Sequence, residues 1–244
     1  MPSLQTEIKV EELGQRSAED LLRFAFERFS GRAAIGTSLQ KTGVVLIDLA
    51  ARLGVPFRVF FVDTLLNHPE TYELLGRVEE RYGITIERYA PEPGEVEALY
   101  REAGQYAHFF DRRRCCAVRK RRPLQRALAT LNAWISGLRA DQSAHRQQTA
   151  AKAGWAQDET GRSLLKLNPL REWTARDVDT YTRTRELPYN ALYDYRSPYG
   201  ERYHVIGCRC CHVPVQPDRA GRAGKFPWET GKKECGLHDQ GSGI

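Results

Sequence analysis

The chain has 244 residues, of which 41% are hydrophobic and 28% are charged, and its formal net charge is +6 at pH 7. A chain of this length buries about 70–75% of its unfolded surface, so its core needs no disulfide framework. No apolar run approaches the ~20 residues of a membrane span, and the N-terminal segment MPSLQTEIKVEELGQ has neither the basic nor the apolar region of an export signal. These features exclude a disulfide-stapled secreted domain and a membrane-spanning protein, and they favour a cytoplasmic location.

Helices and strands are predicted to alternate in the first half of the chain. Residues 17–29 have helical spacing with Ser17 as the N-cap, and AAIGTS at 33–38 is typical of a short buried strand. Such alternation with short links predicts an α/β fold, in which a three-layer parallel sheet is flanked by helices. The other predicted elements are a helix over 43–54, a strand over 56–64, a helix over 68–83, strands over 84–91 and from 132, and a helix over 174–187 capped by Thr174 and Asp177.

Three polar loops follow predicted strands: GTSLQKTG (36–43), DTLLNHPE (63–70) and SGLRADQS (136–143). Ligands of parallel sheets bind beyond the carboxyl ends of the strands, so we expect these loops to converge on one site. The first loop leads into a helix, and its amides, with Thr37 and Ser38, are suited to an anion. It is neither a Walker A loop nor a GxGxxG fingerprint, however, so an ordinary turn is the alternative.

The third loop carries Arg139, with Arg146 shortly after it. A guanidinium offers a planar fork of donors that suits phosphate or sulfate, whereas solvated surface arginines are the alternative interpretation. Asp63 stands at a strand end, where it either points into the cleft or caps the next helix.

A basic segment, DRRRCCAVRKRRPLQR at 111–126, holds eight Arg or Lys residues against one Asp. A solvated face and a nucleic-acid contact are two interpretations, but the aromatic interleaving typical of the second is missing. A positive wall around an anionic cofactor or substrate is the third, and the cysteines inside the segment favour it.

The six cysteines cluster in the second half of the chain, which in a reducing compartment indicates metal binding or catalysis. The tandem pair Cys115 and Cys116, with Cys208-x-x-Cys211, supplies the four thiolates wanted by a zinc ion or an iron–sulfur cluster. Adjacent helical residues point about 100° apart, which suits a cluster with a separate iron for each sulfur better than a single ion. Free thiols or a redox pair remain a further alternative.

Cys235 stands alone in KKECGLH, between two lysines and a glycine. Neighbouring cations raise the thiolate fraction of a cysteine, so this residue is a candidate nucleophile; an incidental cysteine is the alternative.

The combined pattern resembles the assimilatory adenylyl-sulfate reductases, the iron–sulfur branch of the phosphoadenylyl-sulfate reductase family. The resemblance covers roughly residues 30 to 238 and is carried by CC-x-x-RK (115–120), GLRADQS (137–143), NPL-x-x-W-T (168–174), ELPYNALY (186–193), IGC-x-x-C (206–211) and KECGLH (233–238). It implies an adenine nucleotide alpha hydrolase-like (PP-loop-type) fold in a single reductase domain over 1–244. Within it, 1–29 would be an N-terminal helical segment, 30–206 the nucleotide-binding core, and 207–244 the cluster-ligand loop and a mobile catalytic tail.

The activity that the resemblance implies is reduction of adenosine 5′-phosphosulfate to sulfite and AMP, through an S-sulfocysteine on Cys235 that thioredoxin or a similar dithiol then reduces. The implied cofactor is a [4Fe–4S] cluster of structural and electrostatic use. We expect neither nucleic acid nor a membrane as a partner, and a homo-oligomer is compatible with the resemblance. The implied site residues are Cys235, His238 and Lys120 for catalysis, Thr37, Ser38, Asp63, Arg119, Gly137, Arg139, Arg222 and Lys225 for the substrate, and Cys115, Cys116, Cys208 and Cys211 for the cluster. Cys210 occupies a position where many relatives carry proline, and we interpret it as a packing residue.

Three alternatives stay open at this point. The first is reduction of 3′-phosphoadenylyl sulfate, or use of both nucleotides. The second is an ATP-dependent tRNA thiolation enzyme, although such enzymes carry SGGxDS where this chain has GTSLQKT. The third is a non-enzymatic zinc module that contacts nucleic acid through the basic segment.

Overall fold

The computed structural model describes residues 7–219 and 222–229, which fold around a six-stranded sheet of order β3-β2-β1-β4-β6-β5. All neighbouring strands run parallel except β5, which pairs antiparallel with β6 at one edge. The predicted α/β class with helices on both faces is therefore confirmed. The strands are β1 (Ala33–Thr37), β2 (Arg58–Val62), β3 (Ile86–Tyr89), β4 (Ala133–Ser136), β5 (Ala153–Gln157) and β6 (Ser163–Leu167).

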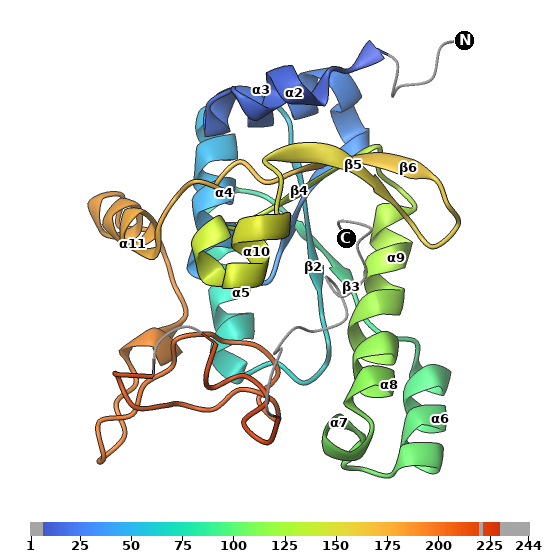
Figure 1. Ribbon diagram of the computed structural model, residues 1–244, viewed down its shortest axis with the longest axis vertical. Coiled ribbons are helices and arrows are strands. Elements are labelled where there is room, and N and C mark those ends of the chain that lie inside the picture. The colour runs from blue at the N-terminus through green and yellow to red at the C-terminus, as the bar shows by residue number, and fades with distance from the viewer. Residues whose placement is uncertain (1–6, 220–221, 230–244) are drawn as a thin grey trace.

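One face of the sheet is covered by several helices, which Figure 1 shows on the side opposite α9. These helices begin and end at recognisable signals: Ser17 caps α3 by accepting the amide of Asp20 at 3.0 Å, and Gly83 ends α5 in the left-handed conformation. Between this layer and the sheet lies the larger apolar core, which includes Leu46, Ile47 and Phe61. The helices are α2 (Val10–Gly14), α3 (Ala18–Phe29), α4 (Lys41–Arg52), α5 (Pro69–Tyr82) and, packed outside α4, α11 (Ala175–Thr184).

The opposite face carries a smaller core formed with α9 (Arg122–Leu128), whose Leu124 and Leu128 pack near Phe60 and Trp134. A continuous helical corner leads into α9: α6 (Pro93–Ala103), α7 (Ala107–Phe110), α8 (Arg112–Cys116) and a π-helical turn over Ala117–Arg121. The corner was not predicted from sequence; in its second part, residues 112–121, basic residues mask the apolar spacing. None of the helices among the described residues is long and apolar enough to cross a membrane.

Two further elements differ from the predictions. Helix α4 begins at Lys41 and not at residue 43, because the carbonyl of Gln40 already accepts the amide of Gly43 at 2.8 Å. The β5–β6 hairpin was not predicted; its turn is held by Asp158, whose Oδ1 accepts the amides of Thr160 and Arg162. The capping box of α11 was predicted correctly, since Thr174 and Asp177 exchange side-chain and backbone hydrogen bonds.

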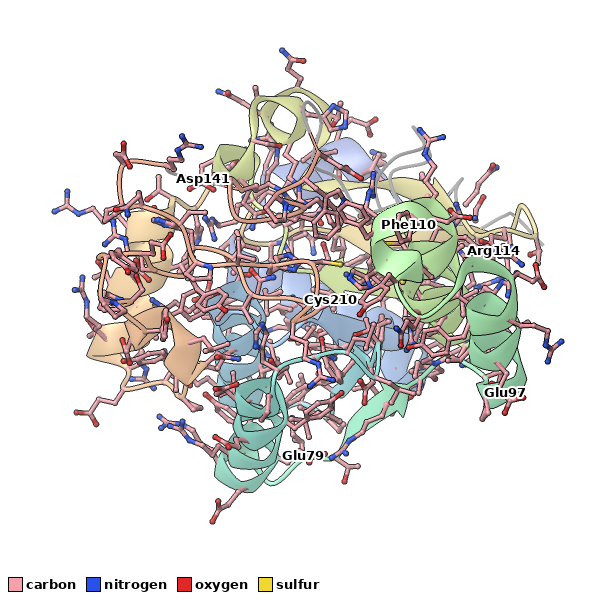
Figure 2. The ribbon with its side chains drawn as sticks, turned by 90° about the horizontal axis from the view of Figure 1, so that it is seen from below. Glu79, Glu97, Phe110, Arg114, Asp141 and Cys210 are labelled. Carbon is pink, nitrogen blue, oxygen red and sulfur yellow. The ribbon has the colours of Figure 1, made fainter. Side chains whose placement is uncertain are left out.

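The segment after α11 has little regular structure, as predicted, beyond a 3₁₀ turn at Ala191–Asp194. In Figure 1 it lies below the sheet, in orange and red, between α11 and the α6–α8 corner. Figure 2 looks at the molecule from that end, and in this view Cys210 lies between Asp141 on one side and Phe110 and Arg114 on the other. The short 3₁₀ turn Ala140–Gln142 and α10 (Ala144–Thr149) follow β4.

Candidate active site

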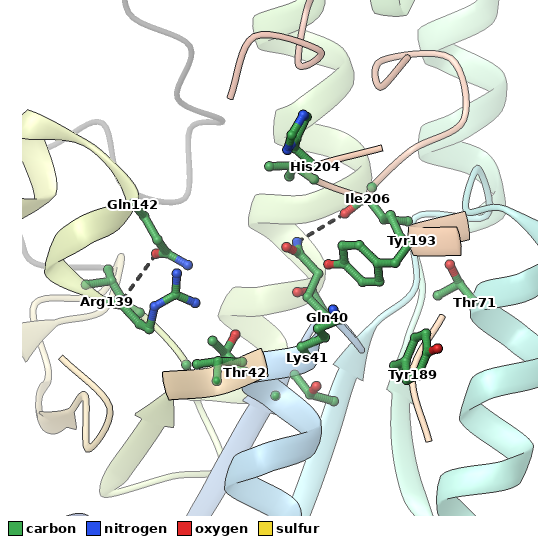
Figure 3. Close-up of a pocket in the computed structure, with 18 of the residues that line it drawn as sticks. Gln40, Lys41, Thr42, Thr71, Arg139, Gln142, Tyr189, Tyr193, His204 and Ile206 are labelled. Atoms are coloured by element: carbon green, nitrogen blue, oxygen red, sulfur yellow. Dashed lines mark hydrogen bonds between the residues drawn. The ribbon is translucent and has the colours of Figure 1, made fainter. Parts of the chain in front are cut away.

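A cavity of about 860 Å³ lies at the carboxyl ends of β1, β2 and β4. All three polar loops singled out in the sequence contribute to its wall, as expected for a parallel sheet, and the segment after α11 closes it from the other side (Figure 3). Of the predicted substrate and catalytic residues that the structure describes, those in the wall are Thr37, Ser38, Lys120, Gly137, Arg139, Arg222 and Lys225.

The first loop is tightly packed against the start of α4. The Thr37 hydroxyl accepts the amide of Leu39 at 2.9 Å, and a Cβ on Gly43 would lie only 2.2 Å from that hydroxyl oxygen. A Cβ on Gly137 would likewise lie 2.9 Å from the hydroxyl of Thr42, so β4 ends in direct contact with α4. Residues 40–43 at the start of α4 therefore line the cavity in a tightly packed position, and a helix N-terminus there suits an anionic ligand.

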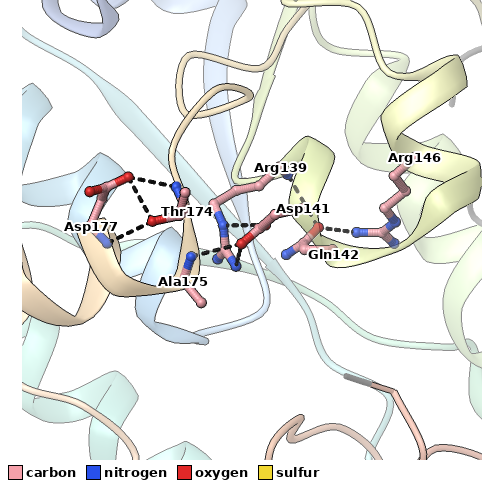
Figure 4. Close-up of polar contacts among 7 residues, drawn as sticks. All are labelled: Arg139, Asp141, Gln142, Arg146, Thr174, Ala175 and Asp177. Atoms are coloured by element: carbon pink, nitrogen blue, oxygen red, sulfur yellow. Dashed lines mark hydrogen bonds and ion pairs between the residues drawn. The ribbon is translucent and has the colours of Figure 1, made fainter. Parts of the chain in front are cut away.

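Arg139 is held at the cavity wall by its own loop (Figure 4). Its Nε and Nη2 donate to the two carboxylate oxygens of Asp141 at 2.9 and 3.2 Å, and Asp141 Oδ2 also accepts the amide of Ala175 at 2.7 Å. The side-chain oxygen Oε1 of Gln142 accepts the backbone amide of Arg139 at 3.2 Å and a hydrogen bond from the guanidinium of Arg146. The first turn of α11 thus fixes Asp141, and Asp141 in turn orients the guanidinium of Arg139.

A second cation, Lys41, forms a different part of the wall. Its ammonium pairs with Asp179 at 2.7 Å and lies 4.8 and 5.3 Å from the ring centroids of Tyr193 and Tyr189. Burial raises the pKa of Tyr193, with the charge of Asp179 as the next cause, so its phenol stays protonated and is able to donate a hydrogen bond. Sequence reasoning gave no role to these aromatic partners.

Lys120, Lys225 and His212 line the side of the cavity that adjoins the cysteines. Lys225 and His212 are only 2% and 4% exposed, and a Cβ on Gly207 would overlap the imidazole. Burial, followed by the charges of Lys120 and Lys225, holds the pKa of His212 well below its ordinary value, so the ring is neutral. The sequence predicts no function for His212, because its proximity to two cations appears only in the fold.

Two predicted substrate residues, Asp63 and Arg119, lie outside the cavity wall and support the loop that follows β2. Asp63 Oδ1 accepts the amide of Leu65 at 2.9 Å and the hydroxyl of Tyr72 at 2.8 Å; burial and this bond raise the pKa of Tyr72 to about 12. Arg119 is 3% exposed and donates to the carbonyl of Thr64 at 2.8 Å. Their contact with a substrate stays a prediction.

The four predicted ligand cysteines are all buried, with exposures of 5–7%, and the described cysteines are free thiols. Cys116, Cys208 and Cys211 belong to one packed cluster around Phe226, and Cys115 borders it from the preceding position of α8. Burial, with the neighbouring Cys116 next, raises the pKa of Cys115 to about 12. In the described part of the chain, no group of three or more His, Cys, Asp or Glu side chains is arranged to hold a single metal ion.

The extra cysteine of the motif, Cys210, is half-buried and its sulfur lies 3.6 Å from that of Cys211. A hydrogen bond from Cys211 lowers the pKa of Cys210 to about 7, and the same bond together with burial raises the pKa of Cys211. The predicted nucleophile Cys235 and the predicted catalytic His238 lie outside the described residues.

The parallel sheet, the polar loops beyond its strands and the cavity lined by several cations define an enzyme of the α/β class, with buried thiols beside the cavity. Residues 32–214 match the family model of the phosphoadenosine phosphosulfate reductase domain, and the chain belongs to this family.

Similar proteins agree with this assignment. The chain is 40% identical over 230 residues to the adenosine 5′-phosphosulfate reductase of Pseudomonas aeruginosa strain LESB58, covering 93% of this chain and 84% of that protein. It is 35% identical to adenosine 5′-phosphosulfate reductase 2 of Bacillus subtilis strain 168, covering 91% of this chain and 89% of that protein. A phosphoadenylyl-sulfate reductase from Candida auris has a similar structure, with a TM-score of 0.69, 26% identity and coverage of 87% of this chain and 98% of the other. Yeast FAD synthetase shares the fold at 16% identity and a TM-score of 0.55, covering 93% of this chain and 75% of that structure.

Proposed function

We propose that this protein reduces adenosine 5′-phosphosulfate to sulfite and AMP in sulfate assimilation. The observation that carries the proposal is the position of Lys120, which lines the nucleotide cavity and lies on the π-helical turn directly after the cysteine pair. A sulfonucleotide whose nucleotide end lies on the loops would therefore present its sulfonate to the cationic side of the cavity. Family membership and the names of the relatives support the same reaction.

The fixed groups of the cavity account for substrate activation. Attack at sulfur increases the negative charge on the sulfonyl oxygens and on the departing phosphate, so preorganised cations lower the barrier. Lys120 and Lys225 stand on the cysteine side of the wall, while Arg139, oriented by Asp141, stands on the loop side. His212, buried beside these lysines, adds no charge; its Nδ1 lies 3.3 Å from the carbonyl oxygen of Cys208, the acceptor for the single N–H of a neutral ring.

The covalent step is proposed for Cys235. Its thiolate attacks the sulfur, the bond between that sulfur and the bridging oxygen breaks, and AMP leaves with the electron pair. One thiol of a thioredoxin-type dithiol then attacks Cys235 Sγ, and sulfite leaves with the electron pair of the S–S bond. The second thiol attacks the mixed disulfide, so the dithiol becomes a disulfide, Cys235 regains its thiol, and two electrons have reduced the sulfonyl sulfur. His238 follows Cys235 closely in the sequence and is proposed to assist it.

The buried thiols fit a [4Fe–4S] cluster. Cys116, Cys208 and Cys211 pack together in a nearly solvent-free place, and the buried Cys115 precedes Cys116 on α8, where the sulfurs of consecutive helical positions diverge. When bound, the cluster would supply an anionic centre that stabilises this region and interacts with nearby cations. Lys120 is within electrostatic range of Cys210 and Cys211, so the same ammonium would interact with both the cluster and the substrate.

The further assignments extend this proposal. We place the whole chain in one reductase domain, with Asp63 and Arg119 acting on the substrate through the loop that they hold, and we place the protein in the reducing cytoplasm because its buried thiols are free. A homo-oligomer remains compatible with the proposal.

The test is an assay of protein purified without oxygen. We expect about four irons and four sulfides per chain, and equal amounts of sulfite and AMP from adenosine 5′-phosphosulfate with thioredoxin as reductant. Cys235→Ser should abolish sulfite release and keep the iron. A colourless zinc-loaded protein would contradict the cofactor, and absence of sulfite from both the 5′-phosphosulfate and its 3′-phosphorylated form would contradict the activity.

Comparing those two nucleotides also tests substrate choice. Lys41 is already paired with Asp179 and enclosed by two tyrosines, so this cation is neutralised before any 3′-phosphate arrives. We expect faster turnover of the unphosphorylated nucleotide, and equal rates would make the protein a dual-substrate reductase.

A further inference from the structure

The face of the sheet that α9 covers holds a polar group without a hydrogen-bond partner among the described residues, and the proposed reaction does not use this group. Trp134 on β4 is 5% exposed and lines the cavity, and its indole Nε1 has no hydrogen-bond partner among the described residues. Burying a donor without an acceptor costs roughly 1–3 kcal/mol, so native structures rarely retain one unless a ligand or ordered water pairs with it.

The position of this indole is set by strand register. Trp134 lies beside Ala34 of β1 and beside Lys166 of β6, so its side chain shares a sheet face with both. A Cβ on Gly36 would lie 2.6 Å from Trp134 Nε1 and 2.6 Å from Phe60 Cζ. Two aromatic side chains therefore approach each other across the bare backbone of Gly36, and the N–H lies at that meeting point.

The surroundings of the N–H favour a neutral, flat ligand group. Phe60 and Leu124 form the adjacent wall of the cavity and are 2% and 3% exposed, whereas Lys120 and Lys225 line the wall beside the cysteines. An apolar, aromatic recess with one directed donor is the arrangement expected for a heteroaromatic base.

Lys166 supports the ring from behind. Its ammonium lies 4.8 Å from the centroid of the Trp134 ring, on the face of the indole, and the residue is 7% exposed. A buried cation against the π-face holds the ring in one orientation and draws electron density from it, which strengthens the N–H as a donor.

From this geometry we propose that Trp134 is a substrate-positioning residue whose indole N–H donates a hydrogen bond to a ring nitrogen of the purine base. The inference rests on the proposed function, because it takes the nucleotide of that reaction as the ligand. Trp134 binds the part of the substrate that does not react, so its contribution is equal in the ground state and the transition state.

The test measures binding of AMP, the nucleotide product, to the intact protein by calorimetry. Trp134→Phe keeps an aromatic ring and removes only the donor, so we expect affinity to fall about 3- to 10-fold, the usual range for one neutral hydrogen bond. Trp155→Phe is the matched control, because Trp155 lies on β5 and packs against the other core. The Michaelis constant for adenosine 5′-phosphosulfate should rise by the same factor at unchanged kcat.

Deaza analogues identify the acceptor. One of 1-deaza-, 3-deaza- and 7-deaza-AMP should bind wild type less tightly than AMP by that factor and should lose nothing further in Trp134→Phe. The indole N–H resonance of Trp134 should move on adding AMP to wild-type protein, which tests the contact even if the variant folds poorly. Equal AMP affinity of wild type and variant, or an unmoved resonance with AMP bound, overturns the inference. Absence of both AMP binding and sulfite release would overturn the proposed function.

Discussion

The cavity has two halves that are held in place by different means. The loop half, residues 36–43 and 136–142, is fixed by hydrogen bonds and ion pairs, in which Arg139 pairs with Asp141 and Lys41 with Asp179. The other half, called the thiol half, is lined by Lys120, His212 and Lys225 and adjoins the buried cysteines, of which Cys116, Cys208 and Cys211 pack around Phe226. The loop half is electrostatically balanced by its own side chains, whereas the thiol half buries groups that ionise readily only with a metal bound. Under the proposed function, the difference predicts that the substrate site is preformed and that the thiol half is stabilised by the proposed cluster.

The largest effect is expected where the thiol half loses one ligand. The Cys211→Ser protein should lose most of its iron, and its activity should fall at least about 100-fold, because a hydroxyl replaces a buried thiolate ligand of the proposed cluster. The Cys210→Pro protein should keep its iron and its activity, since the backbone amide of Cys210 donates no hydrogen bond to the backbone of the described residues and its side chain packs at the edge of the group around Phe226. Iron content and sulfite release, measured without oxygen, check the pair. Iron loss in the proline variant would make Cys210 part of the metal site.

Breaking the loop half should leave the cluster untouched. Arg139→Ala removes a charge-assisted donor from the cavity wall, and hydrogen bonds to charged groups contribute about 1.5–3 kcal/mol, so kcat/KM should fall about 10- to 150-fold at full iron content. Arg139→Lys keeps the charge without the planar fork and should recover part of the loss. Unchanged kinetics in the alanine variant would show that Arg139 serves only to hold Asp141.

Outside the thiol half, Lys166 tests how strongly burial alone disfavours the charged form of a side chain. Burial, with the charge of Arg146 next, lowers the pKa of Lys166 to about 8 from 10.5. The unfolded chain therefore binds more protons between these values, and wild-type stability gains from this group as pH rises from 8 to 10.5.

Lys166→Met should accordingly stabilise the protein at pH 7 by roughly 1–2 kcal/mol, less than the full ~3 kcal/mol of such a pKa shift because the Trp134 ring offsets part of the burial cost. The gain should shrink towards zero above pH 10.5. Urea unfolding at pH 7 and near pH 10.5 compares the two proteins. A gain independent of pH would mean that apolar packing, and not charge, is responsible.

The smallest effect is expected for Asp141→Asn. The amide keeps one acceptor for the Ala175 amide but loses the charge that orients Arg139, so a loss of about 3- to 5-fold in kcat/KM is expected, corresponding to roughly 1 kcal/mol. The double variant with Arg139→Ala should be no worse than Arg139→Ala alone. Additive losses would show that Asp141 acts independently of Arg139.

The parts of the fold that follow local rules were predictable. Capping residues and helix-ending residues in the sequence predict α3, α5 and α11. Loops that follow parallel strands lie at one edge of the sheet, and this arrangement brings Thr37, Gly137 and Arg139 together. The cysteine grouping also followed from spacing. What sequence did not reveal depends on direction and on register: Arg119 turns towards Thr64 and away from the cavity, and the pairing of Trp134 with Lys166 exists only once β4 and β6 are neighbours.

The π-helical turn at Ala117–Arg121 lies inside a nearly continuous helix and changes the direction in which the side chains before it point relative to those after it. A wider turn accommodates one extra residue, so everything before it is rotated by about 100° relative to an unbroken α-helix. This offset lets one rod present three directions: Cys116 towards Phe226, Lys120 into the cavity, and Leu124 onto the sheet. Removal of a single residue from this turn would leave the other side chains chemically unchanged. It would nevertheless rotate the thiols on α8 away from the proposed nucleotide site, because the helix on the two sides of the turn would have a different relative orientation.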